Sequence, residues 1–229
     1  MSKVASQRIQ YDTQSRALRT KGTSSAPIYS MIKRVLLTHA ISGEVALDVG
    51  CGTGRLLQYI GQFFKRYVGV DLVRYDDFPP DAEFIQLDLD ARSPTVPDGF
   101  ADIVISAETI EHLENPRQFM RELTRMTKPG GWVIVTTPNQ RSFLSLLTLI
   151  IKGKFNYFQK PDYPAHITAL LEIDLERIAK ECGLVEVSFD FSLHGRIVFT
   201  PKFYPEVISK LFPRAGSDTI LLLARRPAL

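Results

Sequence analysis

The sequence predicts an α/β protein built on a doubly wound, mostly parallel sheet. From residue 44 onward, short apolar segments of strand length alternate with segments in which apolar residues recur at helical spacing. This alternation is typical of a parallel sheet covered by helices on both faces. The chain has 229 residues, 45% of them hydrophobic, which is enough for one well-buried core. We therefore expect one domain, with no internal repeat.

The first predicted unit is a strand, a helix and a second strand. The strands are the buried runs EVALDVG at 44–50 and YVGVDL at 67–72. Between them, five apolar residues recur at the spacing of one helix face, namely Leu56, Leu57, Ile60, Phe63 and Phe64. Residues 28–40 precede this unit and have an amphipathic pattern, which predicts a helix lying against the sheet.

The remaining elements follow in the same alternating order. Further strands are predicted at 82–89, 101–106, 131–138, 184–191 and 218–225. A helix after the fourth strand is well marked, because Asn115 can cap it and Pro116 suits its first position. Its buried stripe is Phe119, Met120, Leu123 and Met126, and the run 128–131 ends it. Residues 171–182 form the next predicted helix, ended by Gly183.

Two regions do not fit the alternation. Residues 1–27 are predicted to be a polar N-terminal arm, and residues 28–229 a single domain. That domain has a long insertion or lid at about 140–170, and long connections are usually lids or binding elements. Within it, 143–158 has two interpretations. We expect a core helix and turn that cover the sheet edge; the alternative is peripheral contact with a membrane surface or a lipid-like acceptor.

Composition narrows the class of protein. The net charge is only +3, so a nucleic-acid partner is disfavoured, although residues 1–22 are basic. The two cysteines, Cys51 and Cys182, match no metal or redox spacing, which fits a reducing compartment. The chain does not open with a signal-peptide pattern, and its longest apolar run, 143–151, is too short to span a bilayer. These features predict a cytoplasmic protein.

A glycine-rich loop predicts a cofactor site. The sequence ALDVGCGTGRLL places Gly50, Gly52 and Gly54 where the first strand turns into the first helix. Glycine lets the backbone approach a ligand closely, and nucleotide-like cofactors bind at the carboxyl ends of such strands. Asp71 ends the second strand, 21 residues after Gly50, so it is predicted to accept hydrogen bonds from ribose hydroxyls. The spacing GxGxG differs from the dinucleotide pattern GxGxxG, which disfavours an NAD-dependent oxidoreductase.

This loop resembles motif I of the class I S-adenosylmethionine-dependent methyltransferases. The resemblance extends over about residues 40–226 and implies S-adenosyl-L-methionine as the cofactor. Its implied binding residues are Asp48, Gly50, Gly52, Gly54, Asp71, Leu72, Asp88 and Leu89. Asp88 matches the acid that contacts the adenine amino group, with Asp90 as the alternative. The family also implies a Rossmann-like, seven-stranded sheet whose last strand, near 218–225, runs antiparallel.

The segment SAETIEHLENP, residues 106–116, follows the fourth strand and bears on the methyl acceptor. An NPPY-like tetrapeptide for methylation of base amino groups does not stand there, and neither does a cysteine for methylation at cytosine carbon. The segment, with KPGGWVIVTTPN and the later His166, resembles the ubiquinone-biosynthesis O-methyltransferase-like enzymes of the type 11 and type 23 group. It also resembles bacterial enzymes assigned to sugar decoration and the 2′-O-methyltransferases of small-RNA ends.

The resemblance gives the polar residues of this segment three alternative roles. We expect His112, Glu108 and His166 to act at the acceptor, with His112 as base or orienter and without a metal. In the metal-dependent relatives, residues matching Glu108, Glu111, His112 and His166 hold a divalent ion, and that donor set suits Mg, Mn or Zn. The third role is structural, because glutamates just before a helix stabilise its N-terminus. His39 and His194 match no motif.

The predicted activity is S-adenosylmethionine-dependent O-methylation of a small molecule. A quinone precursor, a sugar and a lipid-linked intermediate are the acceptors that the resemblance suggests. The alternatives are an RNA 2′-O-methyltransferase and a non-catalytic cofactor-binding module. The sequence does not determine the oligomeric state.

Overall fold

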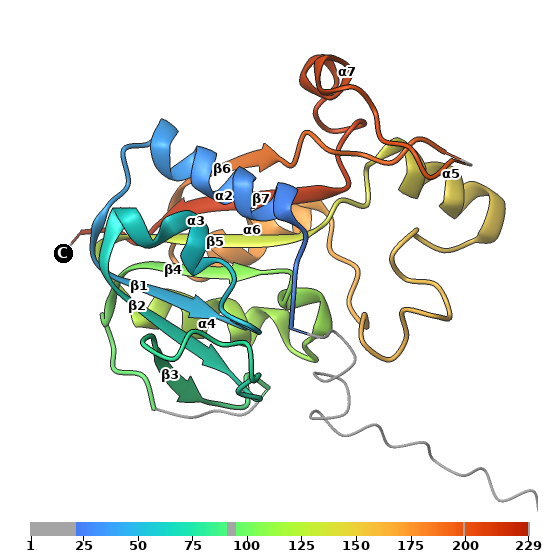
Figure 1. The fold of residues 1–229 in the computed structure, drawn as a ribbon. Coiled ribbons are helices and arrows are strands. Elements are labelled where there is room, and N and C mark those ends of the chain that lie inside the picture. The colour runs from blue at the N-terminus through green and yellow to red at the C-terminus, as the bar shows by residue number, and fades with distance from the viewer. Residues whose placement is uncertain (1–21, 91–94, 199, 229) are drawn as a thin grey trace, which may run out of the picture.

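The computed structural model describes residues 22–90, 95–198 and 200–228 and has the predicted α/β architecture (Figure 1). Seven strands form one sheet in the order β3-β2-β1-β4-β5-β7-β6. The strands are β1 (Gly43–Val49), β2 (Phe64–Asp71), β3 (Glu83–Gln86), β4 (Ala101–Ala107), β5 (Thr127–Pro138), β6 (Val185–Phe191) and β7 (Thr219–Arg225). The α-helices are α2 (Ala26–Thr38), α3 (Leu57–Ile60), α4 (Pro116–Met126), α5 (Phe143–Lys152), α6 (Glu172–Glu181) and α7 (Glu206–Leu211).

The last strand is the antiparallel one, as predicted. β7 pairs antiparallel with both β5 and β6, whereas the pairs among β1 to β5 are parallel. Thr219, the first residue of β7, therefore lies opposite Pro138, the last residue of β5. The start of β7 thus shares one edge of the sheet with the carboxyl ends of the parallel strands.

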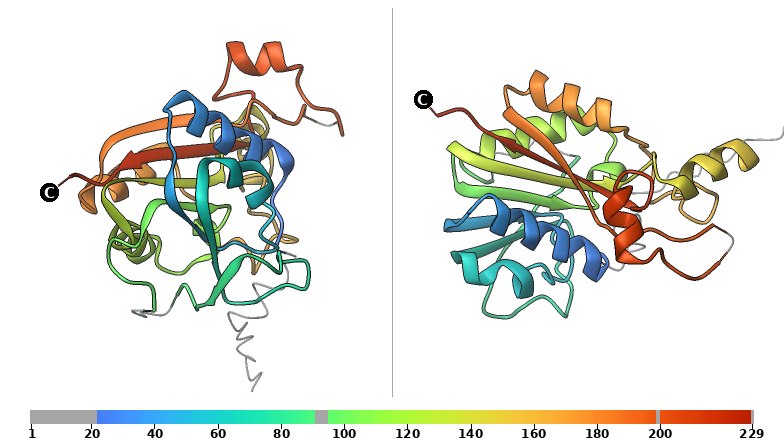
Figure 2. Two further views of the ribbon diagram at one scale, coloured as in Figure 1. Left: turned by 60° about the vertical axis from the view of Figure 1, so that its left-hand side comes forward. Right: turned by 90° about the horizontal axis from the view of Figure 1, so that it is seen from above.

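Helices cover both faces of the sheet, so the core has two layers (Figure 2). On one face, α4 and α6 pack on alternate residues of β1, β4 and β5 through Phe119, Met120, Leu123, Leu175 and Ile178. On the other face, α2 and α3 pack through Met31, Ile32, Leu36 and Ile60. The predicted cap of α4 is present, since Asn115 Oδ1 accepts a hydrogen bond from the amide of Gln118 at 3.0 Å.

Two predicted boundaries are wrong. The helix after the glycine loop is only four residues long, followed by a 3-10 turn at Gly61–Phe63, and Phe64 already belongs to β2. Phe64 pairs with Gly43 in the parallel ladder, and this pairing ends the helix. The fifth strand begins at Thr127, because Thr127 pairs with Ala101 before a bulge in the ladder.

The interpretation of 143–158 as a core helix is also wrong. The fully buried residues of α5 are Ser145 and Thr148, while Phe143 and Ile150 are exposed. The segment projects beyond the sheet edge instead of covering it (Figure 1). The division into an arm at 1–27 and a domain at 28–229 stays a prediction, and the basic residues of the arm lie outside the described residues.

Candidate active site

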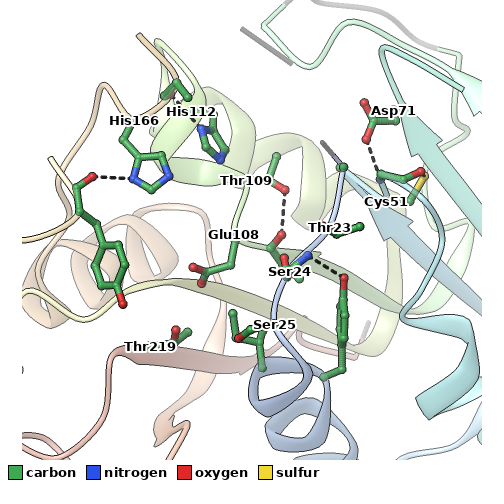
Figure 3. A pocket seen from close by; sticks show the side chains of 18 of the residues that line it. Thr23, Ser24, Ser25, Cys51, Asp71, Glu108, Thr109, His112, His166 and Thr219 are labelled. Atoms are coloured by element: carbon green, nitrogen blue, oxygen red, sulfur yellow. Dashed lines mark hydrogen bonds between the residues drawn. The ribbon is translucent and has the colours of Figure 1, made fainter. Parts of the chain in front are cut away.

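A cavity of about 610 Å³ opens at the carboxyl edge of the sheet. Its walls come from the ends of β1, β2 and β4, the start of β7, and the segments that precede α2 and follow β6. This volume is within the range of roughly 300–1,000 Å³ that is usual for ligand sites. Figure 3 shows its labelled side chains, with Asp71 at one end, His112 and His166 at the other, and Glu108 and Thr109 between them.

The glycine loop is held close to its neighbours. Gly50 and Gly52 both have positive φ, at 79° and 51°, a conformation that favours glycine. A Cβ at Gly50 would lie 2.2 Å from Thr109 Oγ1, and one at Gly52 would lie 2.0 Å from the carbonyl oxygen of Gly22. Both glycines line the cavity, so their backbone can approach a ligand where a side chain would block it.

The third glycine has a different role. Gly54 is not among the residues that line the cavity. A Cβ there would lie 2.7 Å from Pro79 Cδ and 2.9 Å from the ring of Phe78. Gly54 therefore permits packing of the loop against the segment after β2, and does not itself face the cavity.

Asp71 supports the loop from the end of β2. Its Oδ2 accepts a hydrogen bond of 2.8 Å from the amide of Gly52, and its Oδ1 one of 3.3 Å from the amide of Val73. Each carboxylate oxygen has a second lone pair, so the side chain can still accept from ribose hydroxyls. Burial raises the pKa of Asp71, while the two amides oppose that rise. Leu72 follows it in the cavity wall.

Asp48 is almost fully buried beneath the loop. Its Oδ2 accepts a hydrogen bond from the hydroxyl of Tyr67. Burial raises the pKa of Asp48 to about 7, and the bond from Tyr67 only partly offsets this. The residue therefore lines the cavity as a carboxyl group that takes up a proton more readily than an exposed aspartate does.

Asp88, Leu89 and Asp90 line the cavity beside β3. Asp90 Oδ1 accepts a hydrogen bond of 2.9 Å from the amide of Glu114, so this carboxylate ties the loop to the segment before α4. Asp88 uses Oδ1 to accept from the amide of Asp90 at 3.0 Å. Each of the two carboxylates accepts one amide through Oδ1, so the assignment of Asp88 to the adenine, with Asp90 as the alternative, stays a prediction.

Glu108 lies directly after β4 in a backbone conformation unusual for its type, with φ at 54°. Its amide donates to the carbonyl oxygen of Thr136, and its Oε1 accepts from Thr136 Oγ1 at 3.1 Å. The end of β5 therefore fixes both backbone and side chain. Burial and the charge of Glu111 raise the pKa of Glu108 well above its ordinary value.

Glu111 and His112 follow on a short 3-10 turn that precedes α4. Glu111 is completely buried, and its Oε2 accepts from Thr137 Oγ1 at 3.1 Å. Its Oε1 has no hydrogen-bond partner among the described residues. Burial raises the pKa of Glu111. An orphaned buried carboxylate oxygen is costly, so it points to a proton or cation at this place.

The two histidines are held in the same way, each by a backbone carbonyl near its Nδ1 atom. His112 Nδ1 lies 2.8 Å from the carbonyl oxygen of Ala165, and His166 Nδ1 lies 2.7 Å from that of Tyr157. A carbonyl only accepts, so both Nδ1 atoms carry a proton, and in the neutral ring Nε2 is then the basic nitrogen. The rings contact edge to face at 4.7 Å between centroids. Burial and the neighbouring His112 lower the pKa of His166.

These groups fit the donor set of a divalent ion. One ligand atom each from Glu111, His112 and His166 lies within 4.8 Å of the other two. Metal-binding histidines usually donate their other ring N–H to a carbonyl or carboxylate, as both do here. Glu108 lies outside this group of three, and Glu111 is behind the cavity wall and not part of it.

The far wall of the cavity was not predicted. It contains Tyr157 from the insertion, and His194, Arg196, Phe203 and Asp218 from the segments around β7. Asp218 Oδ2 accepts from the hydroxyl of Tyr157 at 3.1 Å, whereas Oδ1 is buried without a partner among the described residues. His194 matches no motif, but it stacks on Phe203 at 3.9 Å between centroids. These residues lie far apart in sequence, so local patterns carried no signal for them.

Known proteins resemble the chain in sequence and in fold. A family model described as a methyltransferase domain matches residues 26–188. The chain is 27% identical over 156 residues to a ubiquinone biosynthesis O-methyltransferase of Albidiferax ferrireducens, covering 59% of this chain and 62% of that protein. It is 31% identical over 120 residues to the enzyme of the same name from Pseudomonas entomophila, covering 48% and 51%. The chain thus spans about half the length of the curated relatives it matches.

Solved structures agree with the fold. A SAM-dependent methyltransferase from Archaeoglobus fulgidus has a TM-score of 0.61 at 18% identity, over 86% of this chain and 94% of that chain. One from Aquifex aeolicus has a TM-score of 0.55 at 15% identity, over 95% of this chain and 100% of that chain. At these identities the likeness is one of architecture.

Proposed function

Because the chain belongs to the methyltransferase domain family and uses S-adenosylmethionine as its cofactor, we propose that it transfers a methyl group to a hydroxyl of a small molecule. When bound, the cofactor supplies a methyl group on a sulfonium, which is already a strong electrophile. The protein must then align the acceptor oxygen with that methyl group and take its proton. The glycine loop, Asp71 and Asp88 would hold the cofactor.

The observation that carries this proposal is the position and orientation of His112. Its ring lines the cavity and donates through Nδ1 to Ala165, so Nε2, which lies 4.0 Å from Glu111 Oε1, is the ring nitrogen that would take up a proton. In the proposed reaction His112 Nε2 would take the proton of the acceptor hydroxyl, while the cofactor would supply the methyl group to the acceptor oxygen and be left as S-adenosylhomocysteine. Glu108 and His166 would position the acceptor from either side of that ring.

The far wall favours an acceptor rich in hydroxyl groups. Glu108 and Asp218 both present carboxylate oxygens there, and Asp218 Oδ1 has no partner among the described residues. Such oxygens accept hydrogen bonds from hydroxyls. This supports a sugar or another polyhydroxylated ring as the acceptor.

The test combines a product screen with a matched pair of variants. A metabolite extract is incubated with the protein and labelled cofactor, and methylated products are detected by mass. His112→Ala should lower turnover by roughly 10²–10⁴-fold, the usual contribution of a general base, without weakening cofactor binding in calorimetry. His39→Ala is the control, because His39 directly follows α2, away from the cavity, where its ring contacts Trp132. Equal turnover of all three proteins would refute the role of His112.

A second role for the histidines is favoured by one observation, the convergence of ligand atoms from Glu111, His112 and His166. A divalent ion held there would bind and acidify the acceptor hydroxyl. Treatment with EDTA distinguishes the roles. Full turnover in EDTA is expected for a base without metal; loss of turnover that added Mg, Mn or Zn restores would assign the three residues to an ion.

The alternatives of another class have their own readouts. An RNA enzyme would produce oligonucleotides with a methylated 3′-terminal ribose. A cofactor-binding module would bind S-adenosylmethionine in calorimetry yet give no labelled product with extract or RNA. Either result would replace the small-molecule proposal.

A further inference from the structure

Helix α5 buries hydroxyl residues and exposes apolar ones, which is the opposite of the usual arrangement in a surface helix. Its hydroxyl residues Ser145 and Thr148 face inward and are buried, where Ser145 Oγ donates to Gln140. Four of its large apolar residues are exposed, with Ile150 79% exposed and Ile151 58% exposed. A surface helix normally directs its apolar stripe to the core. The exposed stripe of α5 therefore requires a partner other than this sheet.

Helix α7 likewise buries a polar residue and exposes apolar ones. Its fully buried residue is Ser209, whose hydroxyl donates to the carbonyl oxygen of Gly216 at 2.8 Å. Its exposed side carries Val207, Ile208 and Leu211, the last of them 67% exposed, and Phe212 follows directly. Eight of the thirteen exposed large apolar residues in the described ranges belong to these two segments.

The two segments are joined at the same end of the molecule. The amide of Phe143, the first residue of α5, donates to the carbonyl oxygen of Ala215, and Asn139 Nδ2 donates to that of Arg214. Figures 1 and 2 show both helices projecting at the edge where the carboxyl ends of the parallel strands lie. We call their exposed residues the apolar surface, namely Phe143, Leu146, Ile150, Ile151, Val207, Ile208, Leu211 and Phe212.

The charge around the apolar surface is strongly positive. Residues 139–161 contain four basic residues and no acidic one, and residues 196–214 contain four basic residues and one acidic. These two stretches therefore carry +7, and Glu172, which pairs with both Arg141 and Arg214, reduces this to +6, whereas the whole chain carries only +3. Lys152 and Lys154 directly follow the exposed stripe of α5. Apolar residues with a cationic rim are complementary to the interface of an anionic bilayer.

We propose that α5 and α7 dock the protein on a membrane surface that contains anionic phospholipid. Neither spans the bilayer, because no helix in the described ranges is long and apolar enough to cross one. A second copy of the chain is a poorer partner, since pairing two apolar surfaces would bring two cationic rims together. Docking would place the cavity close to the bilayer, because Arg196 and Phe203, from the stretch that leads to α7, line it.

Vesicle sedimentation tests the proposal without requiring turnover. The full-length protein should sediment with vesicles of phosphatidylcholine mixed with phosphatidylglycerol, and much less with phosphatidylcholine alone. Binding should weaken as salt increases, because the cationic rim is screened. Sedimentation with neither kind of vesicle would overturn the proposal. Equal binding to both would overturn the part assigned to the charges.

Matched variants locate the contact. Ile150→Ser should weaken vesicle binding about tenfold, the effect of losing the burial of one large apolar side chain. Leu211→Ser tests α7 in the same way. Leu37→Ser is the control, because Leu37 is 60% exposed on α2 but precedes β1, at the opposite edge of the sheet. Cofactor affinity should be the same in all three variants, which shows that they fold.

Two further outcomes have a defined meaning. Equal loss of vesicle binding in the Leu37→Ser control would overturn the assignment to α5 and α7. A mass in solution that doubles with concentration, and returns to that of a monomer in Ile150→Ser, would replace the membrane with a second copy of the chain.

Discussion

The cofactor half and the acceptor half of the cavity are built in different ways. The cofactor half uses backbone and short side chains from one stretch, residues 48–90, which folds into neighbouring strands and their loops. The proposed acceptor half joins His112, Tyr157, His166, His194 and Asp218, which come from the turn after β4, the insertion, and the connection between β6 and β7. A site held by local geometry is readable as a motif. A site assembled from distant segments can change its specificity while the motif stays the same.

The largest expected effect is on cofactor affinity, and it tests the proposed cofactor half of the cavity. Asp71→Ala removes the acceptor of the Gly52 amide as well as the predicted ribose contact. Hydrogen bonds to charged groups contribute about 1.5–3 kcal/mol each, so cofactor affinity should fall about a hundredfold in calorimetry. Asp77→Ala, on the exposed loop after β2, should leave the affinity unchanged. Similar affinities for both variants would contradict the placement of the ribose at Asp71.

An intermediate effect is expected on the KM for the acceptor. Asp218→Asn has nearly the same shape and can still accept from Tyr157, but it can place an N–H where the orphaned oxygen stands. The KM for the acceptor should rise about tenfold, the effect of one lost hydrogen bond to a charged group, while cofactor affinity is retained. Asp98→Asn, on the exposed surface, is the control. A loss of cofactor affinity in Asp218→Asn would mean that the two halves are not independent.

The remaining prediction concerns the pH dependence of stability, which is separate from ligand binding. Asp48 has a pKa of about 7 when folded, against 3.8 for an ordinary aspartate. Because the folded value is raised, its contribution to stability is fully present below the unfolded value and is lost as pH rises to about 7. At about 1.4 kcal/mol per pKa unit, the loss is at most about 4 kcal/mol. This loss of stability is expected for the protein without bound cofactor.

Urea unfolding of wild type and Asp48→Asn measures this contribution. The amide keeps an acceptor for Tyr67 but does not ionise, so the variant should gain stability relative to wild type between about pH 5 and about pH 8. Other titrating groups cancel in the difference between the two proteins. A difference that is the same at both pH values would show that Asp48 does not titrate in this range.

Most of the fold was predictable because its signals are local. Apolar runs and helical spacing located all seven strands, and Asn115 with Pro116 marked the start of α4. The short α3 was missed, since its apolar spacing continues into Phe64, and only pairing with Gly43 makes that residue a strand. The position of α5 was missed for a similar reason: an apolar helix has the same sequence whether it faces a core or solvent.

By itself, the sequence determined the order of strands and helices, the glycine loop and the acid at the end of β2. These depend on neighbouring residues and on backbone conformation, which local composition controls. Only the tertiary structure decided that Asp218 and His194 face the cavity, that Glu111 keeps an orphaned oxygen beside two histidines, and that α5 and α7 expose their apolar sides. The physical reason is that β7 runs antiparallel to β5 and β6, so the connection between β6 and β7 lies at the edge where the parallel strands end.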